Sequence, residues 1–267
     1  MDKFSRFLKN HLVVSALIIA VFLFYFIAIM GITDFPAQGS YQDASFLLFN
    51  LECLVPFCII SFCLYGKHAL AATGLYKSPL VGLVYALVCT APMLLYVIAF
   101  GKWNNELSLW YILNASLVAG FFEELFFRGI LLGQLFRYAR WGFVPAVLIS
   151  SLIFALGHIY QGHDLLTSLL SALVTGFGGL LFGWIYVESN YNLWFSIFLH
   201  ALMNFSWIAF SLGWNAASAG IGLNVERLLT VVVAVALIVV YKKRNNLPYL
   251  INKRTLWRNR IGEIPPV

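Results

Sequence analysis

The chain has 267 residues, of which 61% are hydrophobic, 17% are aromatic and only 10% are charged. Soluble domains carry about 25% charged residues, so this composition argues against a water-soluble fold and favours a membrane protein. The formal net charge of +6 does not indicate nucleic-acid binding, because the basic residues gather in short segments between apolar runs and accompany no nucleic-acid-reading motif.

Eight apolar runs follow one another along the chain, each near the roughly 20 residues that a helix needs to cross a bilayer. The fourth run is too long for a straight span, so it must tilt, bend or end in an interfacial turn. No repeat or long linker divides the chain, and we expect an all-α, polytopic membrane protein in which residues 1–267 form a single membrane domain. The runs cover residues 12–30, 45–65, 80–100, 108–136, 143–160, 165–187, 192–212 and 221–241.

Lysine and arginine residues predict the orientation of these helices, because cytoplasmic loops are enriched in both. With both termini in the cytoplasm, 14 of the 17 basic residues lie on that side. Arg128 then lies inside a span, and Lys102 and Arg227 lie on the opposite side. Residues 242–267 are expected to form a basic cytoplasmic tail that can lie against anionic headgroups. The small size of the chain favours a bacterial plasma membrane.

The fourth run contains ionisable side chains, which are costly inside a membrane and therefore indicate function. Two adjacent carboxylates, Glu123 and Glu124, precede Arg128 among phenylalanines. Glu124 and Arg128 stand four residues apart on one helix face, so we expect them to pair. Glu123 points about 100° away and has no evident partner on its own helix, which leaves it free for chemistry. The alternative is an ion-paired lock that only holds helices together, although one arginine cannot neutralise two carboxylates.

Two later runs carry further polar groups. His158 lies in the fifth run, and His200 and Asn204 lie four residues apart on one face of the seventh. At a rise of about 1.5 Å per residue, these three side chains and Glu123 lie about 14–22 Å below the predicted cytoplasmic ends of their helices. Because the three helices alternate in direction, we expect the four groups to meet in one intramembrane pocket.

The sixth run carries a stripe of small residues, Thr175, Gly179 and Gly183, at intervals of four. Small residues let helix backbones approach closely in a membrane. Our hypothesis is that this stripe packs the two histidine-bearing helices together; generic helix packing unrelated to the site is the alternative.

Three motifs, all within residues 120–205, give the chain a family resemblance. In type and order they resemble the motifs of the CPBP family of intramembrane proteases, which includes the CAAX prenyl endopeptidases and bacterial relatives often labelled as bacteriocin-immunity proteins. The resemblance implies peptide-bond hydrolysis within the membrane, by helices that enclose a water-filled polar cavity. The motifs are Glu123-Glu124-xxx-Arg128, Phe154-xxx-His158 and His200-xxx-Asn204.

The same resemblance implies a role for each group. Glu123 and His158 would activate water, His200 and Asn204 would stabilise the oxyanion, and the ion pair of the fourth run would support them. Amide hydrolysis needs such a base and such donors. The resemblance favours a mechanism without metal or any other cofactor. The alternative is a catalytic zinc site formed by Glu123, His158 and His200, a His₂Glu ligand set, although the HExxH signature is absent.

Two other classes of function stay open from the sequence. A proton-coupled transporter can also use intramembrane carboxylates and histidines, although no internal repeat is visible. A non-catalytic immunity or peptide-binding membrane protein would keep the same residues only for its fold. For the protease, a membrane-associated peptide and a lipidated protein both fit as substrates, and the sequence does not specify an oligomeric state.

Overall fold

Helices build the described part of the chain, as the sequence predicted. The structure is a computed structural model that describes residues 10–25, 41–211 and 221–261. Within these ranges it contains no β-sheet, only one isolated bridge between Trp141 and Arg258. The principal helices are α2 (His11–Phe24), α4 (Ser45–Tyr65), α5 (Ala69–Thr73), α6 (Pro79–Phe100), α7 (Leu109–Leu113), α8 (Ala119–Glu124), α9 (Gly133–Arg137), α10 (Phe143–Leu156), α11 (Leu165–Glu188), α12 (Leu193–Ile208) and α13 (Ile221–Arg244).

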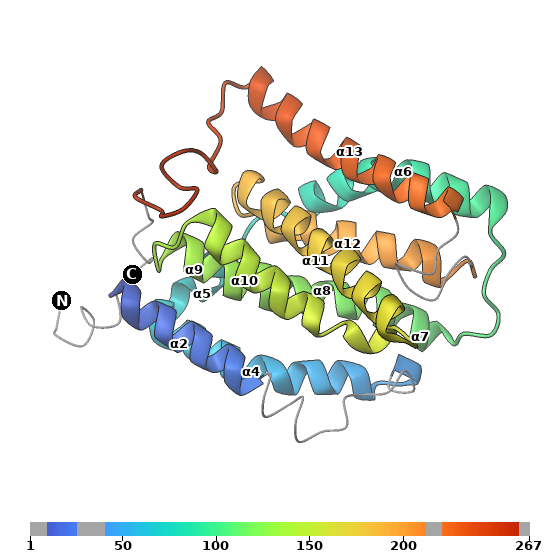
Figure 1. The fold of residues 1–267 in the computed structure, drawn as a ribbon, viewed down its shortest axis with the longest axis horizontal. Coiled ribbons are helices and arrows are strands. Elements are labelled where there is room, and N and C mark those ends of the chain that lie inside the picture. Colours follow the sequence, from blue (N-terminus) through green and yellow to red (C-terminus); the bar gives the residue numbers. More distant parts are fainter. Residues whose placement is uncertain (1–9, 26–40, 212–220, 262–267) are drawn as a thin grey trace.

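The long helices lie side by side in one bundle (Figure 1). Helices α2 and α4 form one edge of the bundle, and α6 and α13 form the opposite edge. Helices α8, α10, α11 and α12 lie between these edges, where α10 packs on α11 and α12 packs on α6. The middle of the bundle therefore consists of the helices that carry the three sequence motifs.

Five helical segments in the described ranges are long and apolar enough to cross a membrane. The helices in the first and seventh predicted runs are shorter, His11–Phe24 and Leu193–Ile208. Residues 26–30 of the first predicted run and residue 212 of the seventh lie outside the described residues. The five long segments are Ser45–Thr73, Pro79–Phe100, Phe143–Gln161, Leu165–Glu188 and Ile221–Arg244.

Large apolar side chains cover the outside of the bundle. On α4 they include Ile59 and Phe62, which are 59% and 68% exposed, and on α11 Phe177 is 69% exposed. Water would make so much exposed apolar surface unfavourable, whereas lipid chains solvate it. The protein is therefore a polytopic membrane protein, as its composition indicated.

The fourth predicted run is the centre of the bundle. It forms one nearly continuous helical segment, residues 109–137, in which two π-helical stretches interrupt the α-helix: η4 (Asn114–Val118) and η5 (Leu125–Leu132). All residues from 124 to 139 are buried. The run also widens locally at these stretches, and π-helical turns of this kind are frequent at functional sites.

Glycines permit the closest helix contacts around this centre. A Cβ atom on Gly179 of α11 would lie 2.7 Å from Ser151 Oγ, and one on Gly183 would lie 2.8 Å from a methyl group of Val147. The glycines of the predicted stripe thus pack α11 against α10, the helix that leads to His158. The approach to α12 instead depends on Gly120 of α8, whose Cβ would lie 3.0 Å from the backbone of that helix.

Residues 245–261 of the predicted basic tail pack back against the bundle, and we call them the C-terminal strap. Phe143 N–H donates to the Thr255 carbonyl (2.8 Å), and Asn259 donates to the Phe136 carbonyl (2.8 Å). The strap therefore contacts the ends of α9 and α10.

Replacing Gly179 with leucine should destabilise the bundle, because the added Cβ would also lie 3.1 Å from the Ser151 Cα and the backbone there cannot easily yield. Overpacking of this kind costs about 1–3 kcal/mol. Gly178→Leu is the matched control, since a Cβ there meets no atom within 4 Å. Thermal unfolding in detergent should show a lower transition for Gly179→Leu alone; equal transitions for both variants would contradict the packing described.

Candidate active site

The two motif residues that the sequence paired do form an ion pair. Arg128 Nη1 lies 2.9 Å from Glu124 Oε1, and the two side chains are 1% and 0% exposed. Glu124 ends α8 and Arg128 lies in η5, one turn further along the central segment. The predicted pair is thus confirmed, and it is completely buried within protein rather than exposed to lipid.

Aromatic rings surround the guanidinium of Arg128. Its Cζ lies 4.6 Å from the ring centre of Phe154 on α10 and 5.5 Å from that of Phe182 on α11. The negative faces of aromatic rings attract a guanidinium, most strongly where water is excluded. Arg128 therefore links the central segment to both neighbouring helices.

His200 extends this network from α12. Its Nδ1 lies 2.8 Å from Glu124 Oε1, and its ring stacks on Phe182 with ring centres 5.4 Å apart. An ionised carboxylate only accepts hydrogen bonds, so Nδ1 is the donor and the other ring nitrogen, Nε2, faces away from Glu124. Sequence spacing assigned Glu124 to Arg128 alone; the structure shows that Glu124 also fixes the orientation of His200.

Glu123 takes no part in the bonds that join Glu124 to Arg128 and to His200 Nδ1. Its side chain is 26% exposed, and its Oε2 lies 3.8 Å from His200 Nε2. That distance is longer than a hydrogen bond and short enough for an electrostatic interaction. The adjacent glutamates therefore differ in role: one is buried inside the ion pair, and the other reaches a cavity.

The cavity lies between the central segment, α4 and the end of α10. Its volume of about 70 Å³ leaves room for water, since one water needs about 10–15 Å³ measured in this way. Glu123 and His158 both line it, whereas His200 and Asn204 do not. Most of the remaining wall is aromatic, and the lining residues besides the two motif residues are Tyr25, Tyr41, Phe46, Phe49, Asn50, Phe126, Phe127, Phe154, Gly157 and Tyr160.

The structure sets the tautomer of His158. Helix α10 ends at Leu156, so the carbonyl of Phe154 is one of the last-turn carbonyls without a helical partner. His158 Nδ1 lies 2.7 Å from that carbonyl oxygen. Because a carbonyl can only accept, Nδ1 carries the hydrogen, and in the neutral ring Nε2 keeps its lone pair. A neutral His158 can therefore act as a proton acceptor.

Asn204 lies elsewhere in the site. It donates from Nδ2 to the carbonyl of Ala115 (3.1 Å), which belongs to the π-helical stretch η4. This bond joins α12 to the central segment one turn beyond His200. An amide nitrogen carries two hydrogens, so one remains for another acceptor.

Asn114 is a polar residue that the sequence reasoning missed. It is 0% exposed, and its Nδ2 donates to the carbonyls of Tyr41 (3.0 Å) and Asp43 (2.7 Å). These bonds hold Tyr41 at the cavity wall, where burial raises the pKa of its hydroxyl well above the ordinary value and keeps it neutral. An amide inside an otherwise apolar run was the signal available in the sequence.

No group of three His, Cys, Asp or Glu side chains within the described ranges is placed to hold one metal ion. The ligands of the alternative zinc site, Glu123, His158 and His200, all lie within those ranges. His158 shares the cavity with Glu123, while His200 is held by the buried ion pair.

The fold and this site define a polytopic membrane protein with a buried carboxylate–imidazole cluster beside an aromatic cavity. Residues 105–206 match the family described as "Type II CAAX prenyl endopeptidase Rce1-like". The match supports the predicted resemblance to the CPBP family over this region, which covers less than half of the chain and contains all three motifs.

A curated relative supports the same assignment. The chain is 34% identical over 93 residues to the Bacillus subtilis (strain 168) protein named "Putative membrane peptidase YdiL". The matched region covers 35% of this chain and 34% of that relative. No solved structure matches the chain significantly.

The two adjacent glutamates should differ in their effect on stability. Glu124→Gln leaves Arg128 buried without its counter-charge, which should cost about 3–5 kcal/mol of unfolding free energy. Glu123→Gln keeps the buried pair intact and should change stability by less than about 1 kcal/mol. Denaturation of both variants in detergent measures the difference; equal losses would show that the buried pair does not support the fold.

Proposed function

We propose that this protein is an intramembrane endopeptidase that hydrolyses peptide bonds with water activated by Glu123 and His158. One observation carries the proposal: these two side chains, from segments far apart in the sequence, line one aromatic cavity that has room for water. Its match to an Rce1-like peptidase family supports the same reaction.

In the proposed reaction, water is held between the Glu123 carboxylate and His158 Nε2. Glu123 accepts a proton as the water oxygen attacks the peptide carbonyl, and the proton then passes to the leaving amine. The two bases suit this role because both line the cavity, and His158 Nε2 keeps its lone pair in the neutral ring. No covalent enzyme intermediate is needed.

The orientation of His200 supports it as a donor to the oxyanion. Its Nδ1 faces Glu124, and its Nε2 lies on the side of Glu123. When both ring nitrogens carry hydrogen, Nδ1 donates to Glu124 and Nε2 can donate to a developing oxyanion. The second amide hydrogen of Asn204 can do the same.

The proposed substrate is a membrane-associated peptide or a lipidated protein, and the proposed location is a bacterial plasma membrane. Most of the cavity wall is aromatic, which suits an apolar segment of such a substrate. The basic loops predict that both termini lie in the cytoplasm.

Glu123→Gln and His158→Ala should each abolish cleavage of the natural substrate, because loss of a positioned base costs about 10²–10⁴-fold in rate. Comparative proteomics of membrane peptides, from cells that carry wild-type or variant protein, should reveal a substrate that accumulates uncut in both variants. Glu52→Gln is the matched control, since Glu52 is an exposed carboxylate on α4 outside the cavity lining. Full biological activity of folded Glu123→Gln would favour the non-catalytic binding protein.

Exhaustive chelation should leave the activity of purified protein unchanged, because the proposed reaction uses side chains alone. The measurement is the cleavage rate of the recovered substrate before and after chelator treatment, with zinc added back. Loss of activity on chelation and its return with zinc would instead support the site formed by Glu123, His158 and His200.

A further inference from the structure

The C-terminal strap completes the start of α10. The residue before this helix, Gly142, offers no side-chain cap, and the first amides of the helix need acceptors. The strap supplies them: Phe143 N–H donates to the Thr255 carbonyl (2.8 Å) and Val144 N–H donates to the Leu256 carbonyl (2.9 Å). A Cβ on Gly142 would lie 2.0 Å from the backbone of Trp257, so only glycine permits this approach.

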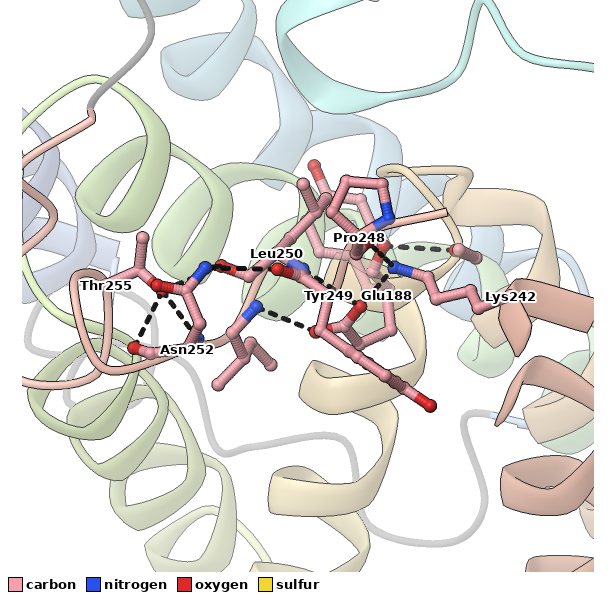
Figure 2. Close-up of polar contacts among 10 residues, drawn as sticks. Glu188, Lys242, Pro248, Tyr249, Leu250, Asn252 and Thr255 are labelled. Carbon is pink, nitrogen blue, oxygen red and sulfur yellow. Dashed lines mark hydrogen bonds and ion pairs between the residues drawn. The ribbon is translucent and has the colours of Figure 1, made fainter. Parts of the chain in front are cut away.

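A buried ion pair fixes the beginning of the strap (Figure 2). Glu188, the last residue of α11, pairs with Lys242 near the end of α13, and the two residues are 2% and 5% exposed. The Glu188 carboxylate also accepts from the amides of Leu250 (3.2 Å) and Ile251 (2.7 Å). The strap is therefore held at both ends rather than left as a loose tail.

The strap lies where three candidate spans terminate. It bonds to the first residues of α10 and the last residue of α11, and it directly follows the last residue of α13. Each of these helices belongs to a segment long and apolar enough to cross a membrane. The strap thus lies at the end of the bundle where these three segments terminate.

Its outward side combines basic and apolar groups. Trp257 and Ile261 are 71% and 63% exposed, while Thr255 and Asn259 are buried and anchor the backbone. In the part of the chain that the structure describes, no carboxylate forms an ion pair with the strap's exposed basic side chains. Those side chains are Lys253, Arg254, Arg258 and Arg260.

We propose that the C-terminal strap is a docking surface for anionic phospholipid headgroups. Its basic side chains match the charge of the headgroup phosphates, and Trp257 has the amphipathic ring that favours the interface between lipid and water. Because buried bonds fix the backbone, these groups meet the membrane as a preformed array. The surface is independent of the proposed hydrolysis, since no strap residue lines the cavity.

Fluorescence of Trp257 in nanodiscs tests this proposal with the full-length protein. Subtracting the fluorescence of Trp257→Phe from that of the wild type isolates the emission of Trp257. Both proteins are placed in phosphatidylcholine discs that contain brominated phosphatidylglycerol or brominated phosphatidylcholine as quencher. At low salt and equal lipid fraction, brominated phosphatidylglycerol should quench Trp257 more strongly than brominated phosphatidylcholine does. The triple variant R254Q/R258Q/R260Q should weaken this preference by at least about fivefold. Loss of one interfacial charge already has about that effect, and this variant loses three.

The matched control is K67Q/K77Q/K102Q, which removes the same charge outside the strap and should keep the preference. Equal quenching of the wild type by both lipids would overturn the proposal, whichever variants fold. If the control variant lost the preference for the anionic lipid as strongly as the triple variant, the proposal would also be overturned, because net charge alone would explain the effect. Inorganic phosphate should not abolish the preference at unchanged ionic strength; if it does, the strap binds free anions rather than the membrane.

Discussion

The buried pair of Glu124 and Arg128 is the constraint on which the rest of the site depends. An ion removed from water costs several kcal/mol unless partners surround it, and in this protein the partners come from three other helices. Phe154 and Phe182 cover the guanidinium, and His200 donates to the carboxylate. Satisfying this one pair thus gathers α10, α11 and α12 around the central segment, and it leaves Glu123 as the carboxylate that reaches the cavity.

The widened turns of the central segment position the groups around this pair. Glu123 and Glu124 lie where α8 gives way to η5, and the earlier stretch η4 carries Asn114 and receives the hydrogen bond from Asn204. Regular α-helix would place these side chains on other faces, because a π-helical turn contains more residues. The polar contacts of the site are therefore built on irregular backbone that packing on all sides supports.

The sequence predicted much of this arrangement because its strongest signals are local. The apolar runs predicted the helices, and spacing within one helix predicted the Glu124–Arg128 pair. Similar depth predicted that Glu123, His158, His200 and Asn204 would meet in one pocket, and the cavity lining includes the first two of them. Contacts between helices were harder, because spacing does not reveal how each helix is rotated about its axis. For that reason the bond from His200 to Glu124, the ring of Phe182 and the anchoring of Tyr41 by Asn114 emerged only from the structure. The family resemblance supplied the proposed oxyanion roles of His200 and Asn204, which remain predictions.

The account's central claim is that Glu123 and His158 act on one water molecule in one cavity. A double-mutant cycle on the cleavage rate of the recovered substrate tests it most directly, since residues that serve one step are not additive. Once Glu123 is replaced by glutamine, replacing His158 with alanine as well should slow cleavage little further. If the two losses multiply instead, the residues act independently and the shared-water mechanism is wrong.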